Sequence, residues 1–383
     1  MIFDQAEYLS RTARVRAELN RRGLSALLLF SQESDYYLFG YDSTGYVFFQ
    51  VVVLTADETP TTLICRRPDV AQARDTSNIE DIRVWLNAPN ANPAQDLKAV
   101  LAEKGLKDSQ VGIELDGYGL TATNYRLVSD ALAGFCGLVD ASDIVRGMRL
   151  IKSQGEIALT RKAGNLADAA VRAVTDEARP GVLDSYLNAA AYGAILRGGG
   201  DPAPGDPLIN SGSRAVYGRS VAGPRELSHQ DQILVELAAT YRRYNCCIER
   251  TIVVGKPSAA HLEQYKVVRE ATESVLEAFV PGDPLGHVDE VHRKVLDKAG
   301  YAEERFAACG YSLGATYRPS WMDVPPMIYS GNSLEMQPGM VFFPHVMLGD
   351  KRTGLAVGLG NTVVVTETGG QSLTSLPLDL IMV

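Results

Sequence analysis

The stretch from Gln232 to Gly255 decides the fold of this chain. It reads Gln232-Ile-Leu-Val-Glu-Leu-Ala-Ala-Thr-Tyr-Arg-Arg-Tyr-Asn-Cys-Cys-Ile-Glu-Arg-Thr-Ile-Val-Val-Gly255. Two apolar runs, 233–239 and 246–254, flank a polar aromatic turn, and this pattern predicts a β-hairpin. Each run carries one carboxylate, Glu236 and Glu249, and an acid inside an apolar strand is costly unless something binds it. Because paired strands can direct both acids into one cavity, the hairpin predicts a site.

A structural role is the alternative for these acids. Buried charges are usually paired, and Glu249 has three arginines close to it in the sequence, Arg242, Arg243 and Arg250. An ion pair with one of them at a sheet edge would also explain the acid.

The hairpin and two later segments resemble the creatinase/prolidase family, whose pita-bread fold is shared by methionine aminopeptidase and aminopeptidase P. The later segments are Cys309-Gly-Tyr-Ser-Leu-Gly-Ala-Thr-Tyr-Arg318 and Pro338-Gly-Met-Val-Phe-Phe-Pro-His345. In the metallopeptidases of that family, five residues bind two divalent metals. The resemblance places those five positions on Glu236, Cys247, Tyr311, His345 and Gly360. Four ligands are therefore replaced, and the fifth is a longer acid.

Two sequence segments resemble particular branches of the family, which cleave carbon–nitrogen bonds in small zwitterions. The run Ile248-Glu-Arg-Thr251 is similar to the Leu-Glu-Arg-Thr of creatinase, a metal-free branch in which the glutamate grips the substrate's guanidinium group. The run Gly310-Tyr-Ser312 is similar to a segment of ectoine hydrolases. The resemblance implies a hydrolase without metal or other cofactor.

The fold class expected is α/β (α+β), with two domains. Residues 1–150 resemble the creatinase/prolidase N-terminal domain, and apolar spacing predicts a helix over 5–23 followed by a buried strand over 24–30. Residues 151–383 form the pita-bread catalytic domain. Its two halves are expected to be pseudo-symmetric, because a pair of predicted helices meets at a Pro-Gly step twice, at Pro180 and Pro281.

The composition of the chain limits the classes of partner that are expected for it. The chain has 383 residues, a net charge of −9 and no basic patch, which argues against nucleic acid. It has no uninterrupted apolar run long enough for a membrane span and no signal sequence at its start, so a cytoplasmic location is expected. Five cysteines without zinc-ribbon spacing predict buried free thiols, with Cys247 as a candidate nucleophile or soft ligand. The resemblance implies a small-molecule substrate and a homodimer.

Several aromatic and basic residues are candidates for substrate binding. Arg219 suits a carboxylate through its fork of donors, although a solvated surface role is equally open. Aromatic faces stabilise a cationic nitrogen, and the proline-rich loop after Gly314 can instead be a rigid dimer contact. The candidates are Tyr217, Arg219, Tyr311, Tyr317, Arg318, Trp321 and Cys247.

His345 is the most informative of the five histidines, because it lies in an apolar strand at a family ligand position. Beside two carboxylates it can shuttle a proton near neutral pH. A core histidine that is hydrogen-bonded to backbone is the alternative. The candidate catalytic residues are therefore Glu249, His345 and Glu236.

The sequence is interpreted as a metal-independent hydrolase that cleaves a carbon–nitrogen bond in a small amidine, guanidine or cyclic amino-acid derivative. An Xaa-Pro dipeptidase-like metallopeptidase is the second hypothesis, with Glu236, Cys247 and His345 holding one metal. A non-catalytic small-molecule or peptide binding protein on the same scaffold is the third.

Overall fold

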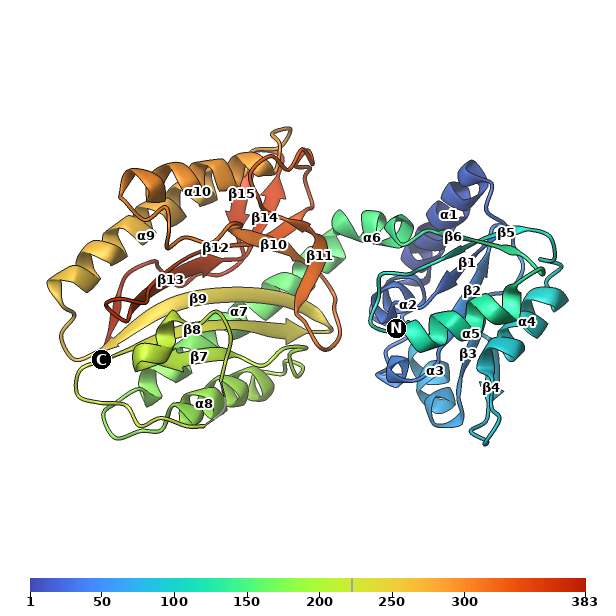
Figure 1. Cartoon of the computed structure of the whole chain (residues 1–383), viewed down its shortest axis with the longest axis horizontal. Coiled ribbons are helices and arrows are strands. Elements are labelled where there is room, and N and C mark those ends of the chain that lie inside the picture. The colour runs from blue at the N-terminus through green and yellow to red at the C-terminus, as the bar shows by residue number, and fades with distance from the viewer. Residues whose placement is uncertain (222) are drawn as a thin grey trace. The chain divides into compact units, whose positions relative to one another are not determined.

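The computed structural model describes residues 1–221 and 223–383, and the chain divides into two units, Met1–Arg149 and Leu150–Val383. The first unit has a six-stranded mixed sheet with strand order β4-β3-β2-β1-β5-β6 (Figure 1). Its strands are β1 Ala26–Leu29, β2 Val51–Thr55, β3 Thr62–Arg66, β4 Asp81–Trp85, β5 Gln110–Ile113 and β6 Gly137–Asp140. Its helices are α1 Gln5–Arg22, α2 Gln32–Phe39, α3 Val70–Thr76, α4 Pro93–Glu103, α5 Ala122–Leu132 and α6 Asp143–Leu150, which runs one residue past the division between the units.

Both faces of this sheet are covered, because β1 is apolar on both sides. Leu28 packs with α4 and α5 on one face, whereas Leu27 and Leu29 pack with α1 and α2 on the other. The predicted first helix is confirmed and ends at Gly23, which adopts the left-handed conformation with φ 69°. A 3-10 turn occupies Gly45–Val47, and β2 begins at Val51.

The second unit is built on a ten-stranded sheet whose main order is β11-β10-β12-β13-β9-β8-β7. Its strands are β7 Leu208–Ser211, β8 Asp231–Tyr241, β9 Tyr244–Val254, β10 Gly310–Leu313, β11 Met322–Met327, β12 Val341–Asp350, β13 Leu355–Asn361, β14 Val363–Thr366, β15 Gly369–Ser372 and β16 Ile381–Met382. Its helices are α7 Gln154–Glu177, α8 Asp184–Arg197, α9 Ala259–Glu277 and α10 Gly286–Lys298. Within the described ranges, no helix combines the length and apolarity that a bilayer span requires.

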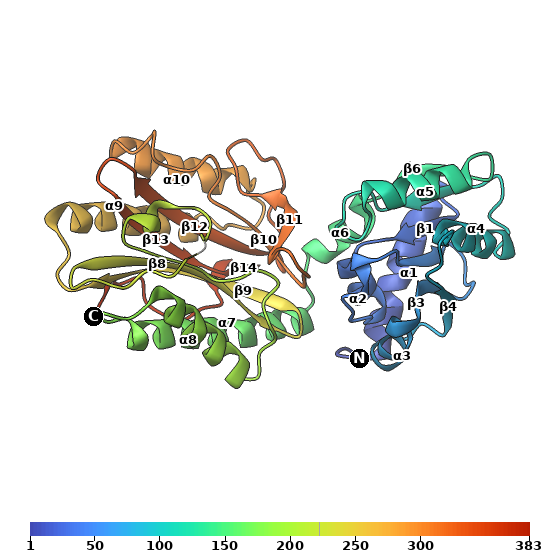
Figure 2. The same cartoon turned by 60° about the horizontal axis from the view of Figure 1, so that its bottom comes forward.

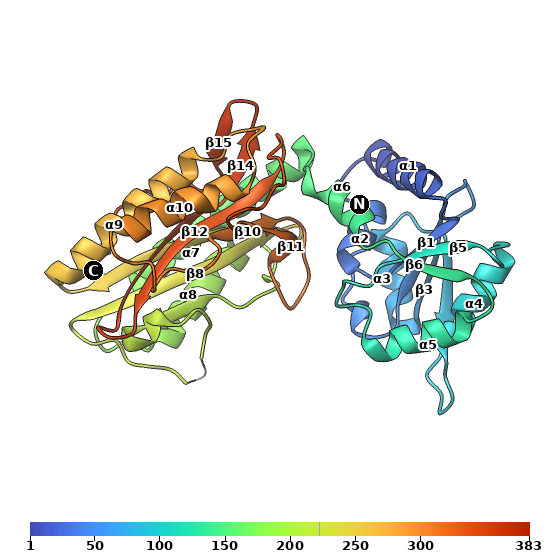
Figure 3. The ribbon, with the colours of Figure 1, turned by 45° about the horizontal axis from the view of Figure 1, so that its top comes forward.

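The two predicted halves are present in this sheet. Helix α7 lies along β8 and β9 with α8 packed against it, and α9 lies along β12 and β13 with α10 packed against it, as Figure 2 and Figure 3 show. Ser153 and Glu156 form a capping box that starts α7. One expectation fails: the proline-rich segment after Trp321 is not all loop, because β11 pairs with β10 at the edge of the sheet, where proline's missing N–H is tolerated.

The predicted hairpin is confirmed as β8 and β9, which pair from Asp231 with Val254 to Tyr241 with Tyr244. Its turn has two residues, Arg242 and Arg243, both with positive φ, as the turn type that matches strand twist requires. Side chains alternate along β8, so Val235 and Leu237 pack under α7 and α8 while Glu236 projects from the opposite face. That face, on which the 3-10 turn Gly212–Val216 packs, holds the candidate site.

Candidate active site

Three neighbouring strands bring the candidate catalytic residues together. Glu236 of β8 stands directly opposite Glu249 of β9. Glu249 in turn pairs with Gly360 of β13, and Gly360 pairs with His345 of β12. Since residues paired in register share a face, Glu236, Glu249 and His345 all project from the same side of the sheet.

Glu249 is fully buried, and both of its carboxylate oxygens lack a hydrogen-bond partner among the described residues. The backbone of β13 makes room for it: a Cβ on Gly358 would lie 2.2 Å from Glu249 Oε1. A buried carboxylate without donors is costly. The position is one that a ligand's N–H groups can stabilise.

An ion pair with a neighbouring arginine was the structural alternative for Glu249, and Arg250 does not form it. This side chain projects from the other face of β9, where its guanidinium donates to Gly360 O at 2.9 Å and to Asn361 Oδ1 at 2.8 Å. Arg242 and Arg243 form the turn at the far end of the hairpin. Glu249 also lies on a central strand rather than at a sheet edge.

His345 is the group nearest to the Glu249 carboxylate. Its Nδ1 lies 3.3 Å from Glu249 Oε2, and its side chain is 13% exposed. The imidazole stacks on Phe343 with a centroid separation of 5.1 Å and meets the Tyr311 ring edge-on at 5.8 Å. The alternative of a core histidine bonded to backbone is not observed, because among the described residues Nδ1 has only the carboxylate nearby.

Burial and the neighbouring charges shift the pKa values of Glu249 and His345 in opposite directions. Burial raises the pKa of Glu249, and the His345 imidazole counters part of that rise. For His345, burial alone would lower the pKa, but the adjacent Glu249 and the charge of Glu236 outweigh burial and raise the pKa above its ordinary value. Both shifts keep a proton on the pair to a higher pH than the free side chains would, which suits proton exchange with a ligand.

Glu236 is held by a two-step hydrogen-bond chain. Trp321 Nε1 donates to Tyr311 Oη at 2.8 Å, and Tyr311 Oη donates to Glu236 Oε1 at 3.1 Å. Tyr311 and Trp321 are buried, so the chain is shielded from water. The structure thus joins three of the predicted site residues: Tyr311 contacts Glu236 directly, and Trp321 orients Tyr311.

Cys247 lies in the same wall but in an apolar setting. It pairs with Ala238, and burial raises the pKa of its thiol well above the ordinary value. A protonated thiol is neither a good nucleophile nor a metal ligand. The structure therefore favours the packing role among those considered for this residue.

The remaining candidates lie at different distances from the acids. Arg219 is exposed and donates to Gly218 O, yet its charge lowers the pKa of His345, which places it within electrostatic range of the site. Tyr217 is 45% exposed on the same loop. Tyr317 is buried at the hairpin turn, with Arg243 over its ring, and Arg318 is exposed near Tyr192.

The residues at the family's metal-ligand positions do not fit a pair of metal ions. Tyr311 Oη is engaged by Glu236 and Trp321, and Cys247 is a buried thiol. At Gly360, a Cβ would lie 2.7 Å from His345 Cβ and 2.8 Å from the Phe343 ring, so the ligand glutamate of the family has no room there.

One cluster with metal-ligand chemistry occurs in residues 1–221 and 223–383, and it lies elsewhere: Asp289, His292 and Cys309, in the core behind α10. The Asp289 carboxylate already accepts from Arg293 Nε at 2.7 Å and Ser330 N at 2.8 Å, which marks a structural network. Glu236, Cys247 and His345 form no such cluster. The single-metal site of the second hypothesis is thus without a suitable donor set.

Two site residues were missed from the sequence, Phe343 and Gly358. Glycines at alternate positions of an apolar strand, Gly358 and Gly360, were the available signal, because such glycines mark the close approach of another group. Phe343 gives no signal, since an apolar residue in a strand is ordinary core.

Comparison with known proteins gives the same family for both units. A model of the creatinase/prolidase N-terminal domain matches residues 11–151, and a model of metallopeptidase family M24 matches residues 158–367. The chain is 25% identical over 394 residues to an ectoine hydrolase of Halomonas elongata, covering 99% of this chain and 98% of that protein. It is 29% identical over 243 residues to an Xaa-Pro dipeptidase of Pyrococcus horikoshii, covering 62% of this chain and 66% of that protein.

The solved structures support the same fold. The crystal structure of recombinant prolidase from Thermococcus sibiricus superposes with a TM-score of 0.88 at 23% identity, covering 98% of this chain and 99% of that one. The two domain models match the two units in the order in which they occur along the chain, and the sheet built around the hairpin agrees with this assignment. The chain belongs to metallopeptidase family M24 and carries the creatinase/prolidase N-terminal domain.

Proposed function

We propose that this chain is a metal-independent hydrolase that cleaves a carbon–nitrogen bond in a small zwitterionic amidine, guanidine or cyclic amino-acid derivative. The observation that carries the proposal is the carboxylate of Glu249, which is fully buried and has His345 Nδ1, 3.3 Å from Oε2, as its one near protein donor among the described residues. A planar cation with N–H groups would supply the missing donors and the balancing charge.

The site offers the groups that hydrolysis of such a cation needs. Glu249 and Glu236 face each other in register and hold the cationic nitrogen, and one of them takes a proton from the attacking water. The water oxygen bonds to the substrate carbon, the carbon–nitrogen bond breaks, and His345 delivers a proton to the leaving nitrogen. The proton that the glutamate took then returns to His345, so one water is consumed in each turnover.

Recognition of a carboxylate is assigned to an arginine at the margin of the site. Arg219 is the better placed of the two candidates, because its charge reaches His345, whereas Arg318 lies at the turn end of the hairpin near Tyr192. Either arginine has the planar fork that suits a carboxylate. We take a homodimer and a cytoplasmic location as part of the same proposal.

The similarity to an Xaa-Pro dipeptidase supports a second candidate, a metal-dependent dipeptidase. It requires divalent metals, and the donor set of this chain does not fit them. The similarity to an ectoine hydrolase over nearly the full length supports the first candidate instead.

A substrate panel in water labelled with oxygen-18 tests the proposal. The purified chain is incubated with ectoine, with creatine and with an Xaa-Pro dipeptide, each with chelator and with manganese. The expected result is one heavy oxygen in the product of a zwitterion, with chelator present and no product from Glu249→Gln. Cleavage of the dipeptide alone, dependent on manganese, would establish the second candidate. Binding without turnover of any zwitterion would indicate a binding protein.

A further inference from the structure

A separate cavity of about 330 Å³ opens at the end of the hairpin opposite its turn. It lies where β8 begins and β9 ends, and its lining includes Arg225, Gln232, Lys256, His261 and Gly354. Its volume falls in the range of small-molecule sites. None of the candidate catalytic residues lines it.

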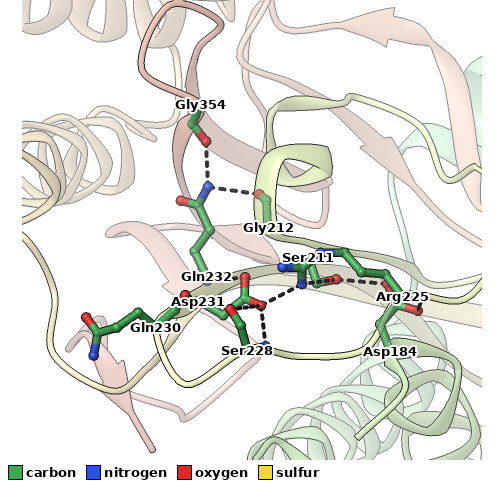
Figure 4. A network of polar contacts seen from close by, with 9 residues as sticks. All are labelled: Asp184, Ser211, Gly212, Arg225, Ser228, Gln230, Asp231, Gln232 and Gly354. Atoms are coloured by element: carbon green, nitrogen blue, oxygen red, sulfur yellow. Dashed lines mark hydrogen bonds and ion pairs between the residues drawn. The ribbon is translucent and has the colours of Figure 1, made fainter. Parts of the chain in front are cut away.

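Arg225 presents one edge of its guanidinium without a protein partner. Its Nη1 donates to Asp231 Oδ2 at 2.5 Å and to Ser211 Oγ at 3.2 Å, as Figure 4 shows. Among the described residues nothing bonds to its Nε or Nη2. The guanidinium lies against the bare Cα of Gly212, where a Cβ would be 2.6 Å from Cζ. Nε and Nη2 together form the fork that binds a carboxylate through two hydrogen bonds.

The charge of the cavity wall is positive. The one acid in its lining, Asp231, is engaged by Arg225, by Ser228 N at 2.9 Å and by Gln232 N at 3.0 Å. Lys256 is exposed, and no carboxylate of the described chain lies within ion-pair distance of it. Within the lining, Arg225 and Lys256 therefore exceed Asp231 by one positive charge, while Asp184 lies outside the lining and accepts from Ser211 Oγ at 2.8 Å and from Arg225 N at 2.8 Å.

His261 adds a hydrogen-bond acceptor. The residue is 3% exposed, and its Nε2 lies 3.0 Å from Ala356 O, so Nε2 carries the hydrogen. Burial lowers the pKa of His261, which keeps the ring neutral and makes Nδ1 an acceptor. In the described part of the chain Nδ1 has no partner, so a donor on a ligand can occupy it.

We propose that this cavity binds a small carboxylate that also carries a hydroxyl or ammonium group. The carboxylate bonds to the Nε–Nη2 edge of Arg225 with Lys256 nearby, and the second group donates to His261 Nδ1. The proposal does not depend on the reaction assigned above, because it uses none of the same residues.

The melting temperature of the full chain with added sodium L-lactate tests this assignment. Sodium chloride and sodium propionate at the same sodium concentration are the references, since propionate lacks the hydroxyl. A ligand that binds only the folded chain raises its melting temperature, and we expect lactate to raise it on the order of 2 °C, more than propionate does.

Four variants locate the binding site that produces the rise in melting temperature. Lys256→Gln should lose most of the rise, whereas the exposed Lys294→Gln on α10 should keep all of it. Arg225→Lys keeps a charge but not the fork, so its rise should also fall, measured against its own baseline because Arg225 holds Asp231. Glu249→Gln should keep the rise, which separates this cavity from the active site. A rise that is absent in the native chain, or equal in native and Lys256→Gln chains, would overturn the proposal.

Discussion

Glu249 combines two properties that a structural acid rarely has: complete burial, and no protein donor near its carboxylate among the described residues other than His345 Nδ1 at 3.3 Å. Removing its charge while keeping its shape is therefore informative. We predict that Glu249→Gln abolishes turnover, because the amide cannot balance a ligand cation. The fold should persist, since the amide keeps the shape of the side chain and an oxygen for the nearby His345 Nδ1.

The measurement is the turnover rate alongside the circular dichroism melting curve. Glu236→Gln should act similarly on the rate, with an added loss of stability because Tyr311 donates to that carboxylate. Unchanged turnover in Glu249→Gln would refute its assigned role.

His345 is predicted to carry the proton. The adjacent Glu249 raises the pKa of His345 above its ordinary value, so the imidazole stays charged to a higher pH than a free histidine. A rate that needs the protonated form should be retained below that pKa and should fall as pH rises through it. His345→Ala should remove this pH dependence and reduce the rate by about a hundredfold or more, the usual worth of general acid–base catalysis.

A pH–rate profile of the native and His345→Ala chains makes the comparison. His345→Glu serves as the second variant, because it restores a family metal ligand while Tyr311 and Gly360 still leave the set incomplete. Activation of His345→Glu by manganese would show that metal chemistry persists in this site.

Among the strands and helices, β13 is the strand that leaves space for the side chains of the site. Its glycines at 358 and 360 face the Glu249 carboxylate and the His345 side chain. We predict that Gly358→Ala displaces the flexible end of Glu249 and lowers activity by about a hundredfold, the effect of roughly 1 Å of misplacement. Its melting temperature should change little.

Gly360→Ala, in contrast, should lower the stability of the fold, because its Cβ would meet the Cβ of His345 and the ring of Phe343. Overpacking of this kind typically costs about 1–3 kcal/mol of unfolding free energy. Gly147→Ala, with open space around it, is the control without a clash, and it should not lower stability, because alanine is a better helix former than glycine. Equal activity of Gly358→Ala and the native chain would show that Glu249 is not held where the reaction needs it.

The same elements show what sequence can and cannot predict here. Strand alternation and the two apolar runs predicted the hairpin, and pairing in register put Glu236 opposite Glu249, because local patterns set strand registers. The contacts of His345 with Tyr311 of β10 and with Glu249 of β9 join three strands that meet only in the folded sheet, so no local pattern reports them. β11 escaped prediction because its prolines argue against a strand, and only its edge position tolerates them.

At the scale of the whole molecule, the chain is predicted to form a homodimer. Family members of this two-domain type pair so that the N-terminal domain of one subunit approaches the site of the other. Sedimentation equilibrium at micromolar concentration should give twice the chain mass of 41.4 kDa. A mass equal to that of one chain would contradict this prediction.

The central claim, hydrolysis without metal, is tested most directly by turnover per chain before and after exhaustive removal of divalent metals, with elemental analysis of the same preparation. The site has a tyrosine, a histidine and a glycine at three of the family's ligand positions, and a buried thiol at a fourth. We predict metal far below one ion per chain and unchanged turnover after chelation. Near-stoichiometric manganese, zinc or cobalt, with activity lost on its removal and restored by its return, would contradict the claim.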